Sequence, residues 1–222
     1  MVEVRHTPLA DWQRLSAYAG QKLYGVPVDS VRLQELQDLL DELGGLAESV
    51  RGAILGEGVV VGLRRCKTTG RLWVDDGARL GSGWTARLVS WAVGNFGSSF
   101  LTYFSALAIN HNSHAKRHQD GQNTGPSFIV SNDRYDNGEL VLCVPDGGQV
   151  EAELTLDIRA SGLYFDGRLA HGSLLATPRA DGWCDRLSLV FYEHDHQGDL
   201  TKELATGLGR LGFNPSPPRA FV

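Results

Sequence analysis

The chain has 222 residues and a formal net charge of −5, and 42% of its residues are hydrophobic. This length and composition suit one domain with a sizeable core, while the acidic balance lacks the basic excess typical of nucleic-acid-binding proteins. Three cysteines without a Cys-x-x-Cys pair exclude a disulfide scaffold or zinc finger and favour a reducing, intracellular setting. No apolar run approaches the roughly 18 residues of a membrane span, so we expect a soluble protein without membrane contact.

Three helices are expected in the first hundred residues. Residues 7–15 form a short helix with Pro8 at its first position, where proline is favoured. Leucines at helical spacing predict an amphipathic helix over 33–43 that ends at the glycines following it. Two tryptophans and a leucine at the same spacing predict a third helix over 84–97, with its apolar side toward the core.

Short strands separated by Gly, Pro, Asn and Asp turns dominate the rest of the chain. Residues 25–27 read as a turn, and the first strands are expected at 59–61 and 71–74. Later strands are expected at 100–110, 127–132, 139–144, 151–157, 162–165 and 186–194. Helices followed by regular short strands predict an α+β fold, a jelly roll with helices packed on one sheet. The single domain divides into helical support, a β-strand core and a tail at 1–98, 99–196 and 197–222.

A histidine and a carboxylate stand two residues apart at His118 and Asp120. Side chains at i and i+2 of an extended strand share a face, so both can reach one ion. His171, which lies 51 positions beyond Asp120, is the candidate third ligand. Two histidines and one carboxylate with the remaining positions open form the facial arrangement of non-haem Fe(II) oxygenases. The pattern therefore predicts an Fe(II) site.

Side chains of the last strand, 186–194, alternate between two faces. One face belongs in the core and carries Leu187, Leu189 and Phe191. The other face carries Val190 together with a cation, a hydroxyl group, a phenol and an imidazole at Arg186, Ser188, Tyr192 and His194. If this face lines a barrel mouth, Arg186 and Ser188 can bind a carboxylate of a dicarboxylic cosubstrate. The alternative is an edge strand whose polar face meets solvent.

These residues together resemble a known enzyme family. His118-x-Asp120, His171 and the Arg186-x-Ser188 pair, 15 residues after the second histidine, look like the Fe(II)/2-oxoglutarate dioxygenases, whose fold is a double-stranded β-helix. The runs 171–178 and 186–194 are similar to the TET/JBP branch, which oxidises the methyl group of 5-methylcytosine or thymine in DNA. The resemblance covers roughly residues 100 to 196. It implies Fe(II) on the two histidines and the aspartate, the far carboxylate of 2-oxoglutarate on Arg186 and Ser188, and O2 as second cosubstrate.

The same resemblance implies DNA containing a methylated base as the partner. In this branch an asparagine three places after the metal aspartate, and the tyrosine and histidine that end the Arg-x-Ser strand, contact the flipped base. Here these positions are Asn123, Tyr192 and His194. The phenol ring suits stacking, and the amide and imidazole offer donors and acceptors to a base edge. Three basic residues near the site are candidates for phosphate contacts: Lys116, Arg117 and Arg134.

Two other functions stay open at this stage. The acidic net charge favours a 2-oxoglutarate-dependent hydroxylase that acts on a protein side chain or a small molecule. A jelly-roll binding module without enzymatic activity would keep the fold and leave the site unused. The oligomeric state is not predicted by any pattern in the chain.

Two further patterns have simpler interpretations. His111 and His114 precede the metal strand, and either is a candidate for a hydrogen bond to a metal ligand. The run Gly207 to Gly212 matches a dinucleotide-binding pattern but follows no strand of a βαβ unit, so we expect no nucleotide site there.

Overall fold

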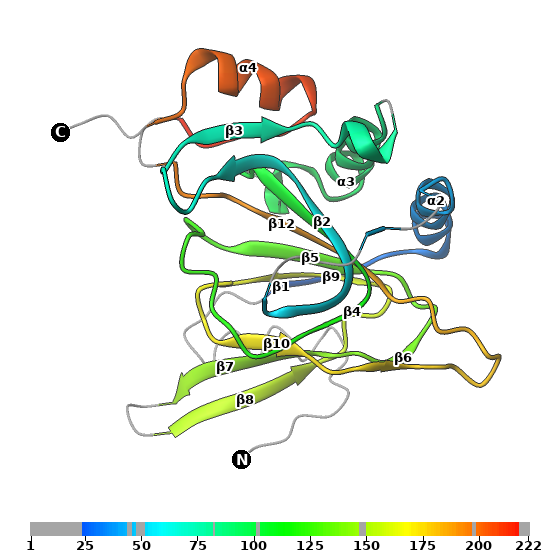
Figure 1. Ribbon diagram of the computed structural model, residues 1–222. Coiled ribbons are helices and arrows are strands. Elements are labelled where there is room, and N and C mark those ends of the chain that lie inside the picture. Colours follow the sequence, from blue (N-terminus) through cyan, green and yellow to red (C-terminus); the bar gives the residue numbers. More distant parts are fainter. Residues whose placement is uncertain are drawn as a thin grey trace.

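The computed structural model describes residues 24–43, 46–47, 52–81, 83–100, 103–146, 150–196 and 199–217. The described residues form a major sheet of seven antiparallel strands in the order β1-β9-β5-β12-β4-β2-β3 and a smaller sheet in the order β10-β7-β8 (Figure 1). Strands β6 and β11 make a two-stranded ribbon. The major-sheet strands are β1 (Tyr24–Pro27), β2 (Ile54–Arg65), β3 (Leu72–Asp75), β4 (Ala106–Ala115), β5 (Ser127–Ser131), β9 (Ser161–Phe165) and β12 (Leu187–Tyr192). The others are β6 (Asp136–Asn137), β7 (Leu140–Asp146), β8 (Val150–Leu156), β10 (His171–Ser173) and β11 (Ala176–Thr177).

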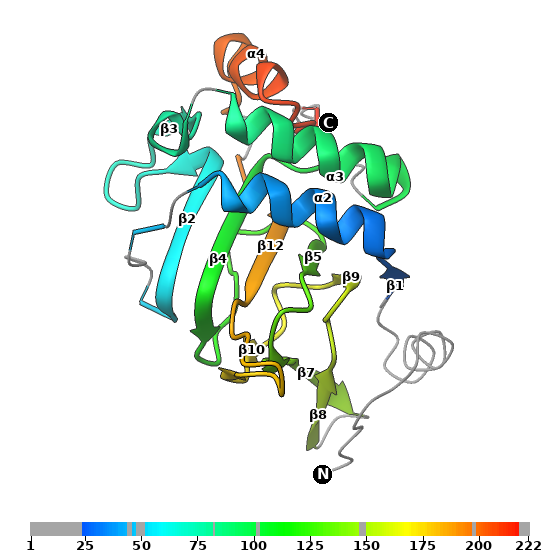
Figure 2. The same ribbon diagram turned by 90° about the vertical axis from the view of Figure 1, so that its right-hand side faces the viewer.

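Two helices, α2 (Ser30–Asp41) and α3 (Trp84–Phe100), lie across one face of the major sheet (Figure 2). The Asp29 side chain caps α2 by accepting a hydrogen bond of 2.9 Å from the backbone N–H of Arg32. Gly97, with a φ of 63°, interrupts the helical geometry of α3. The predicted helices at 33–43 and 84–97 are thereby confirmed, whereas the one at 7–15 and the two glycines after α2 lie outside the described residues.

The alternation of the strands divides the interior into two cores. Leu187, Leu189 and Phe191 of β12 point to the helical side and pack with the buried faces of α2 and α3. A second cluster, which includes Ile129 and Leu142, lies between the two sheets. The opposite face of β12 turns toward this second cluster, against which Val190 packs. The predicted α+β jelly roll with helices on one sheet is confirmed.

Some segments differ from the sequence-based expectation. The strand expected at 100–110 begins later, as β4 at Ala106, because helix α3 continues to Phe100. Residues 24–27 form edge strand β1, paired with β9, instead of a turn, because an edge strand tolerates Pro27 where a central strand would lose a hydrogen bond. The predicted tail contains helix α4 (Lys202–Arg210), capped by Thr201, with Leu208 buried against the helical core. Residues 78–80 form one 3-10 turn between β3 and α3. No helix in the described ranges is both long and apolar enough to cross a bilayer.

Candidate active site

A cavity of about 670 Å³ lies between the two sheets. Side chains from β2, β4 and β12 of the major sheet line it, together with β10 and the segment that follows β4. The eight residues predicted to form the site come from positions up to 76 residues apart, and all of them line this one cavity. They are His118, Asp120, Asn123, His171, Arg186, Ser188, Tyr192 and His194.

The two candidate histidine ligands are brought together by backbone pairing. His118 and His171 face each other across an antiparallel bridge, and each backbone N–H donates to the other residue's carbonyl at 2.8 Å. Directly opposed residues in such a pair project side chains to the same face, and their ring centroids are 4.3 Å apart. A Cβ on Gly172 would approach the carbonyl oxygen of Ala115 to 2.8 Å. Glycine at this position therefore permits the close pairing of the two histidine segments.

Both imidazoles are held in the form that binds a metal. The Nδ1 of His118 lies 2.8 Å from the carbonyl of Lys116, and the Nδ1 of His171 lies 2.8 Å from the carbonyl of Leu169. A carbonyl only accepts, so each Nδ1 is a donor and Nε2 is the ring nitrogen that faces the metal position. Burial also lowers the pKa of His171 below its usual value, which favours the neutral ring.

Asp120 completes a set of three metal-ligand groups. One of its carboxylate oxygens is 3.6 Å from Nε2 of His118, and the other is 3.8 Å from Nε2 of His171. The three ligand atoms all lie within 4.8 Å of one another. Two imidazole nitrogens and one carboxylate oxygen at this spacing match the donor set that a non-haem Fe(II) ion takes, so the residues fit the metal.

Asn123 supports the metal carboxylate as well as lining the cavity. Its Nδ2 donates to Oδ2 of Asp120 at 3.3 Å and to Oγ of Ser127 at 3.2 Å. A Cβ on Gly167 would approach Oγ of Ser127 to 2.7 Å and Nδ2 of Asn123 to 3.2 Å. Gly167 is thus a site residue that sequence reasoning missed, because its role depends on a neighbour about 40 positions away.

Arg186 is a buried cation that the described protein does not neutralise. It is 3% exposed, and its Nη1 donates to the carbonyl oxygen of Ser113 at 2.9 Å. Its guanidinium lies 5.6 Å from the ring centroid of the buried Tyr135. Within the described ranges it forms no ion pair, and its Nε has no hydrogen-bond partner. A buried charge is costly unless it is paired, so this geometry indicates an anionic ligand for Arg186, with Ser188 beside it on the same strand face.

Tyr192 and His194 lie further along the same cavity wall. Nδ1 of His194 lies 3.1 Å from the carbonyl oxygen of Asp195 and must donate to it, which leaves Nε2 as an acceptor. Burial is the main cause that lowers the pKa of His194, and the nearby cations Arg65 and Arg64 lower it further. The neutral imidazole can therefore accept a hydrogen bond from a ligand.

A group of cations at the cavity was not found from the sequence. Arg64, Arg65 and Lys67 from the end of β2 line the cavity with Tyr192 and His194. Arg65 lies 3.6 Å from the carboxylate of the exposed Asp199. These cations precede the predicted β core by more than 30 positions, and only the pairing of β2 with β4 brings them to the site.

Two predictions about the surroundings of the site need correction. The proposed phosphate contacts of Lys116, Arg117 and Arg134, which do not line the cavity within the described ranges, stay a prediction. The edge-strand interpretation of 186–194 is wrong, because β12 lies between β4 and β5 in the middle of the sheet. His111 contacts no metal ligand and instead pairs with Glu57 and Asp185.

The architecture is a jelly roll, and its cavity holds three groups of the types that bind a non-haem Fe(II) ion. Among solved structures, this chain is similar to an oxidoreductase of the 2OG-Fe(II) oxygenase family from Burkholderia pseudomallei, with 17% identity, a TM-score of 0.50 and coverage of 86% of this chain and 93% of that one. It is also similar to SnoK, a non-haem alpha-ketoglutarate-dependent carbocyclase from nogalamycin biosynthesis, with 8% identity, a TM-score of 0.53 and coverage of 96% and 93%.

No protein-family model matches the chain, and no curated protein is similar to it. The similarity to solved structures is thus a similarity of fold. The chain has the fold of the 2-oxoglutarate and Fe(II)-dependent oxygenases.

Proposed function

We propose that this protein is an Fe(II)- and 2-oxoglutarate-dependent dioxygenase. The observation that carries the proposal is one cavity that holds both a facial set of two imidazole nitrogens and a carboxylate, and a buried arginine without a carboxylate partner in the described protein. The first group fits Fe(II), and the second fits the far carboxylate of 2-oxoglutarate. The bound centre would use O2 and 2-oxoglutarate to hydroxylate a substrate, releasing succinate and CO2.

The residues of the chain have separate tasks in this proposal. His118, Asp120 and His171 would hold Fe(II), and their backbone and side-chain hydrogen bonds fix them before the ion arrives. Arg186 and Ser188 would orient 2-oxoglutarate through its far carboxylate. Ile129, Leu140 and Phe165 give the same cavity apolar walls, which exclude water from the cosubstrate.

For the substrate, we propose the methyl group of 5-methylcytosine or thymine in DNA, as in the TET/JBP branch. Tyr192 supplies an aromatic face at the cavity wall, and His194 supplies a neutral acceptor suited to an exocyclic amine. Arg64, Arg65 and Lys67 at the same cavity would contact phosphates on either side of an extruded base. Asn123 would contact the base through the part of its amide that does not hold Asp120.

A second substrate class is favoured by the charge balance. The net charge is −5, and Arg65 already faces Asp199, so the cation group at the cavity is small for a DNA-binding surface. A protein side chain or an anionic small molecule would need fewer phosphate contacts than a duplex. Hydroxylation of such a substrate would use the same metal and cosubstrate residues.

Parallel substrate presentation separates these possibilities. The protein is incubated with Fe(II), 2-oxoglutarate and either 5-methylcytosine DNA, the free nucleoside or a peptide mixture, and succinate is measured together with nucleoside mass spectra. We expect hydroxymethylated base from DNA and no succinate from Asp120→Ala. The exposed Asp181, which pairs with Arg179 at 3.0 Å, provides the matched control Asp181→Ala.

The outcomes distinguish the levels of the proposal. Succinate coupled only to peptide or small-molecule oxidation would retain the enzyme and refute the DNA substrate. Wild-type product from Asp120→Ala would refute the metal assignment. Absence of a charge-transfer band when Fe(II) and 2-oxoglutarate are added anaerobically would favour a binding module without enzymatic activity.

A further inference from the structure

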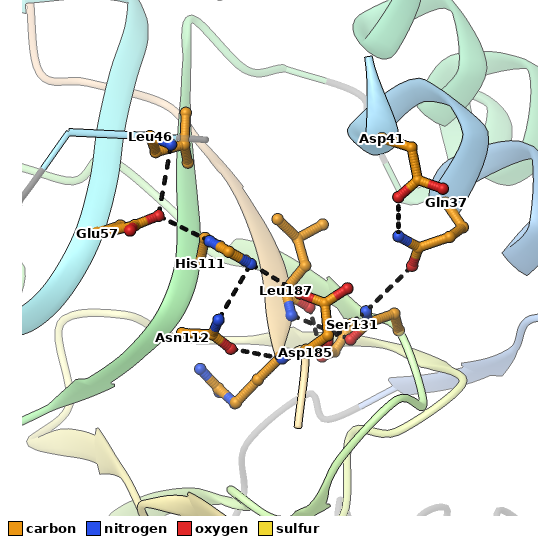
Figure 3. Close-up of polar contacts among 11 residues, drawn as sticks. Gln37, Asp41, Leu46, Glu57, His111, Asn112, Ser131, Asp185 and Leu187 are labelled. Atoms are coloured by element: carbon orange, nitrogen blue, oxygen red, sulfur yellow. Dashed lines mark hydrogen bonds and ion pairs between the residues drawn. The ribbon is translucent and has the colours of Figure 1, made fainter. Parts of the chain in front are cut away.

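A second polar cluster joins Glu57, His111 and Asp185 (Figure 3). His111 of β4 pairs with Leu187 of β12, and the side chain of Leu187 belongs to the core beneath the helices. Paired residues share a sheet face, so His111 also points to the helical side. A hollow of about 190 Å³ lined by His111, Leu187 and residues of α2 such as Gln37 agrees with this position.

His111 is held as an imidazolium between two carboxylates. Its Nδ1 is 2.7 Å from Oε2 of Glu57 on β2, and its Nε2 is 2.7 Å from Oδ1 of Asp185, which precedes β12, with Nδ2 of Asn112 at the longer distance of 3.2 Å. A neutral imidazole has only one N–H, so one of these contacts would set two acceptors against each other. The hydrogen bond with Asp185 is the largest cause that raises the pKa of His111, to about 9, and Glu57 adds to it.

The residues next to this ion-pair cluster hold the backbone of Arg186. Oδ1 of Asn112 accepts from the N–H of Arg186 at 2.9 Å, and the N–H of Asn112 donates to the carbonyl of Arg186 at 2.8 Å. Ser113 then accepts from the Arg186 guanidinium at 2.9 Å. The run 111–113 thus fixes Asp185, the Arg186 backbone and the Arg186 side chain in succession. Arg186 itself stands just before the first residue of β12, where strand pairing is weakest.

The backbone of β4 is shaped for this contact. Asn112 has a φ of 43°, and β2 has a register shift opposite it, between Leu55 and Glu57. A Cβ on Gly56 would approach the carbonyl oxygen of Asn112 to 2.7 Å, so the two strands meet more closely than side chains allow. The bulge brings Glu57 into line with His111 and turns Asn112 toward Arg186.

We propose that His111, held between Glu57 and Asp185, is a positioning residue that sets Arg186 for the anion bound in the cavity. This inference rests on the proposed function, because it assigns 2-oxoglutarate to Arg186. Other charged groups that face the cluster are Asp41 from α2 and Arg134 from the loop after β5. The charge of Arg134 helps to lower the pKa of Asp185. The cluster binds no cosubstrate itself and acts from behind the sheet.

The test is a double-mutant cycle on 2-oxoglutarate binding. The dissociation constant of 2-oxoglutarate is measured anaerobically with Fe(II) for wild type, His111→Gln, Arg186→Lys and the double variant. We expect His111→Gln to weaken 2-oxoglutarate binding about tenfold while Fe(II) binding changes less than about twofold. In the Arg186→Lys background the same substitution is expected to change the dissociation constant of 2-oxoglutarate less than twofold, since the guanidinium that His111 positions is then absent. His114→Gln, on the same strand, is the matched control and should bind as wild type does, because His114 neither lines the cavity nor hydrogen-bonds a metal ligand within the described ranges.

A purely structural role gives a different result. If His111 only stabilises the fold, the effects of the two substitutions add in the cycle, and this would overturn the inference. If His111→Gln does not fold, Glu57→Gln removes one ion pair at a half-exposed carboxylate and should give a smaller loss with the same non-additivity. If wild type binds 2-oxoglutarate and these variants bind it equally well, the inference is overturned and the proposed function stands. If wild type does not bind 2-oxoglutarate, both the proposed function and the inference are overturned.

Discussion

Replacing Arg186 with methionine removes a buried guanidinium while keeping a long, flexible side chain. Arg186 is 3% exposed and has an unpartnered Nε, so the free protein already bears the cost of an unpaired buried cation. In the variant this cost disappears, but the carbonyl of Ser113 loses its donor. These effects oppose each other. We therefore expect the free energy of unfolding of the ligand-free variant to differ from that of wild type by no more than about 1 to 2 kcal/mol.

In the ligand-bound protein, by contrast, replacing Arg186 with methionine can only weaken 2-oxoglutarate binding. Two charge-assisted hydrogen bonds to a carboxylate contribute about 3 to 6 kcal/mol, so loss of the guanidinium should weaken 2-oxoglutarate binding by at least about 100-fold. At a ligand concentration of about 100 times the wild-type dissociation constant, binding stabilises wild type by roughly 2.7 kcal/mol, which raises Tm by roughly 5 to 10 °C in a domain of this size. The variant should show almost none of this increase.

Thermal unfolding with and without 2-oxoglutarate measures both effects, with Mn(II) in place of Fe(II) to avoid turnover. Arg179→Met, at an arginine that pairs with Asp181 at 3.0 Å, is the matched control and should retain the full ligand-dependent increase in Tm. A wild-type increase in Arg186→Met would refute the assignment of the cosubstrate carboxylate to Arg186.

Three other substitutions test separate parts of the structure. Tyr192→Ala should lose base oxidation yet keep much of the succinate formed without substrate, measured by comparing the two products; parallel loss of both would contradict a substrate role. Gly162→Ala should lower the free energy of unfolding by about 1 to 3 kcal/mol in urea titrations, because a Cβ there would approach Cζ of the buried Phe128 to 2.4 Å; wild-type stability would contradict this packing. The pKa of His111 is raised to about 9 from 6.5, so its stabilisation is complete below about pH 6.5 and is lost as pH rises through about 9. Between pH 6 and 9.5 the free energy of unfolding of wild type should therefore fall by about 1 to 2 kcal/mol more than that of His111→Gln, after allowance for solvent screening at Glu57. If the two proteins lose stability in parallel with pH, His111 is not protonated in the folded protein.

The candidate site was predicted largely through the regularity of strands. Side chains alternate with a period of two by covalent geometry, so the sequence alone placed Arg186, Ser188, Tyr192 and His194 on one face of the segment 186–194. The cavity lining agrees with that assignment. The same rule put His118 and Asp120 on one side of an extended segment. Which face meets the cavity is decided by the position of β12 in the middle of the sheet, which the sequence does not specify.

Turn and helix signals gave a less complete prediction. The spacing of leucines and tryptophans was enough for α2 and α3, because a buried helical face repeats every three to four residues. Strand β1 was read as a turn from Gly25 and Pro27, since its place at a sheet edge depends on β9. Helix α4 was missed for a similar reason: it is short, and its apolar contact is with the helical core.

By itself, then, the sequence determined the metal-ligand types, the polar face of the last strand and the jelly-roll class, because these depend on local periodicity and residue chemistry. Tertiary structure alone decided that the segments of His118 and His171 pair residue to residue. It also decided that cations of β2 reach the cavity and that His111 is held behind Arg186. These features depend on antiparallel pairing between residues 44 to 86 positions apart, and hydrogen bonds at that separation leave no periodic signal in the chain.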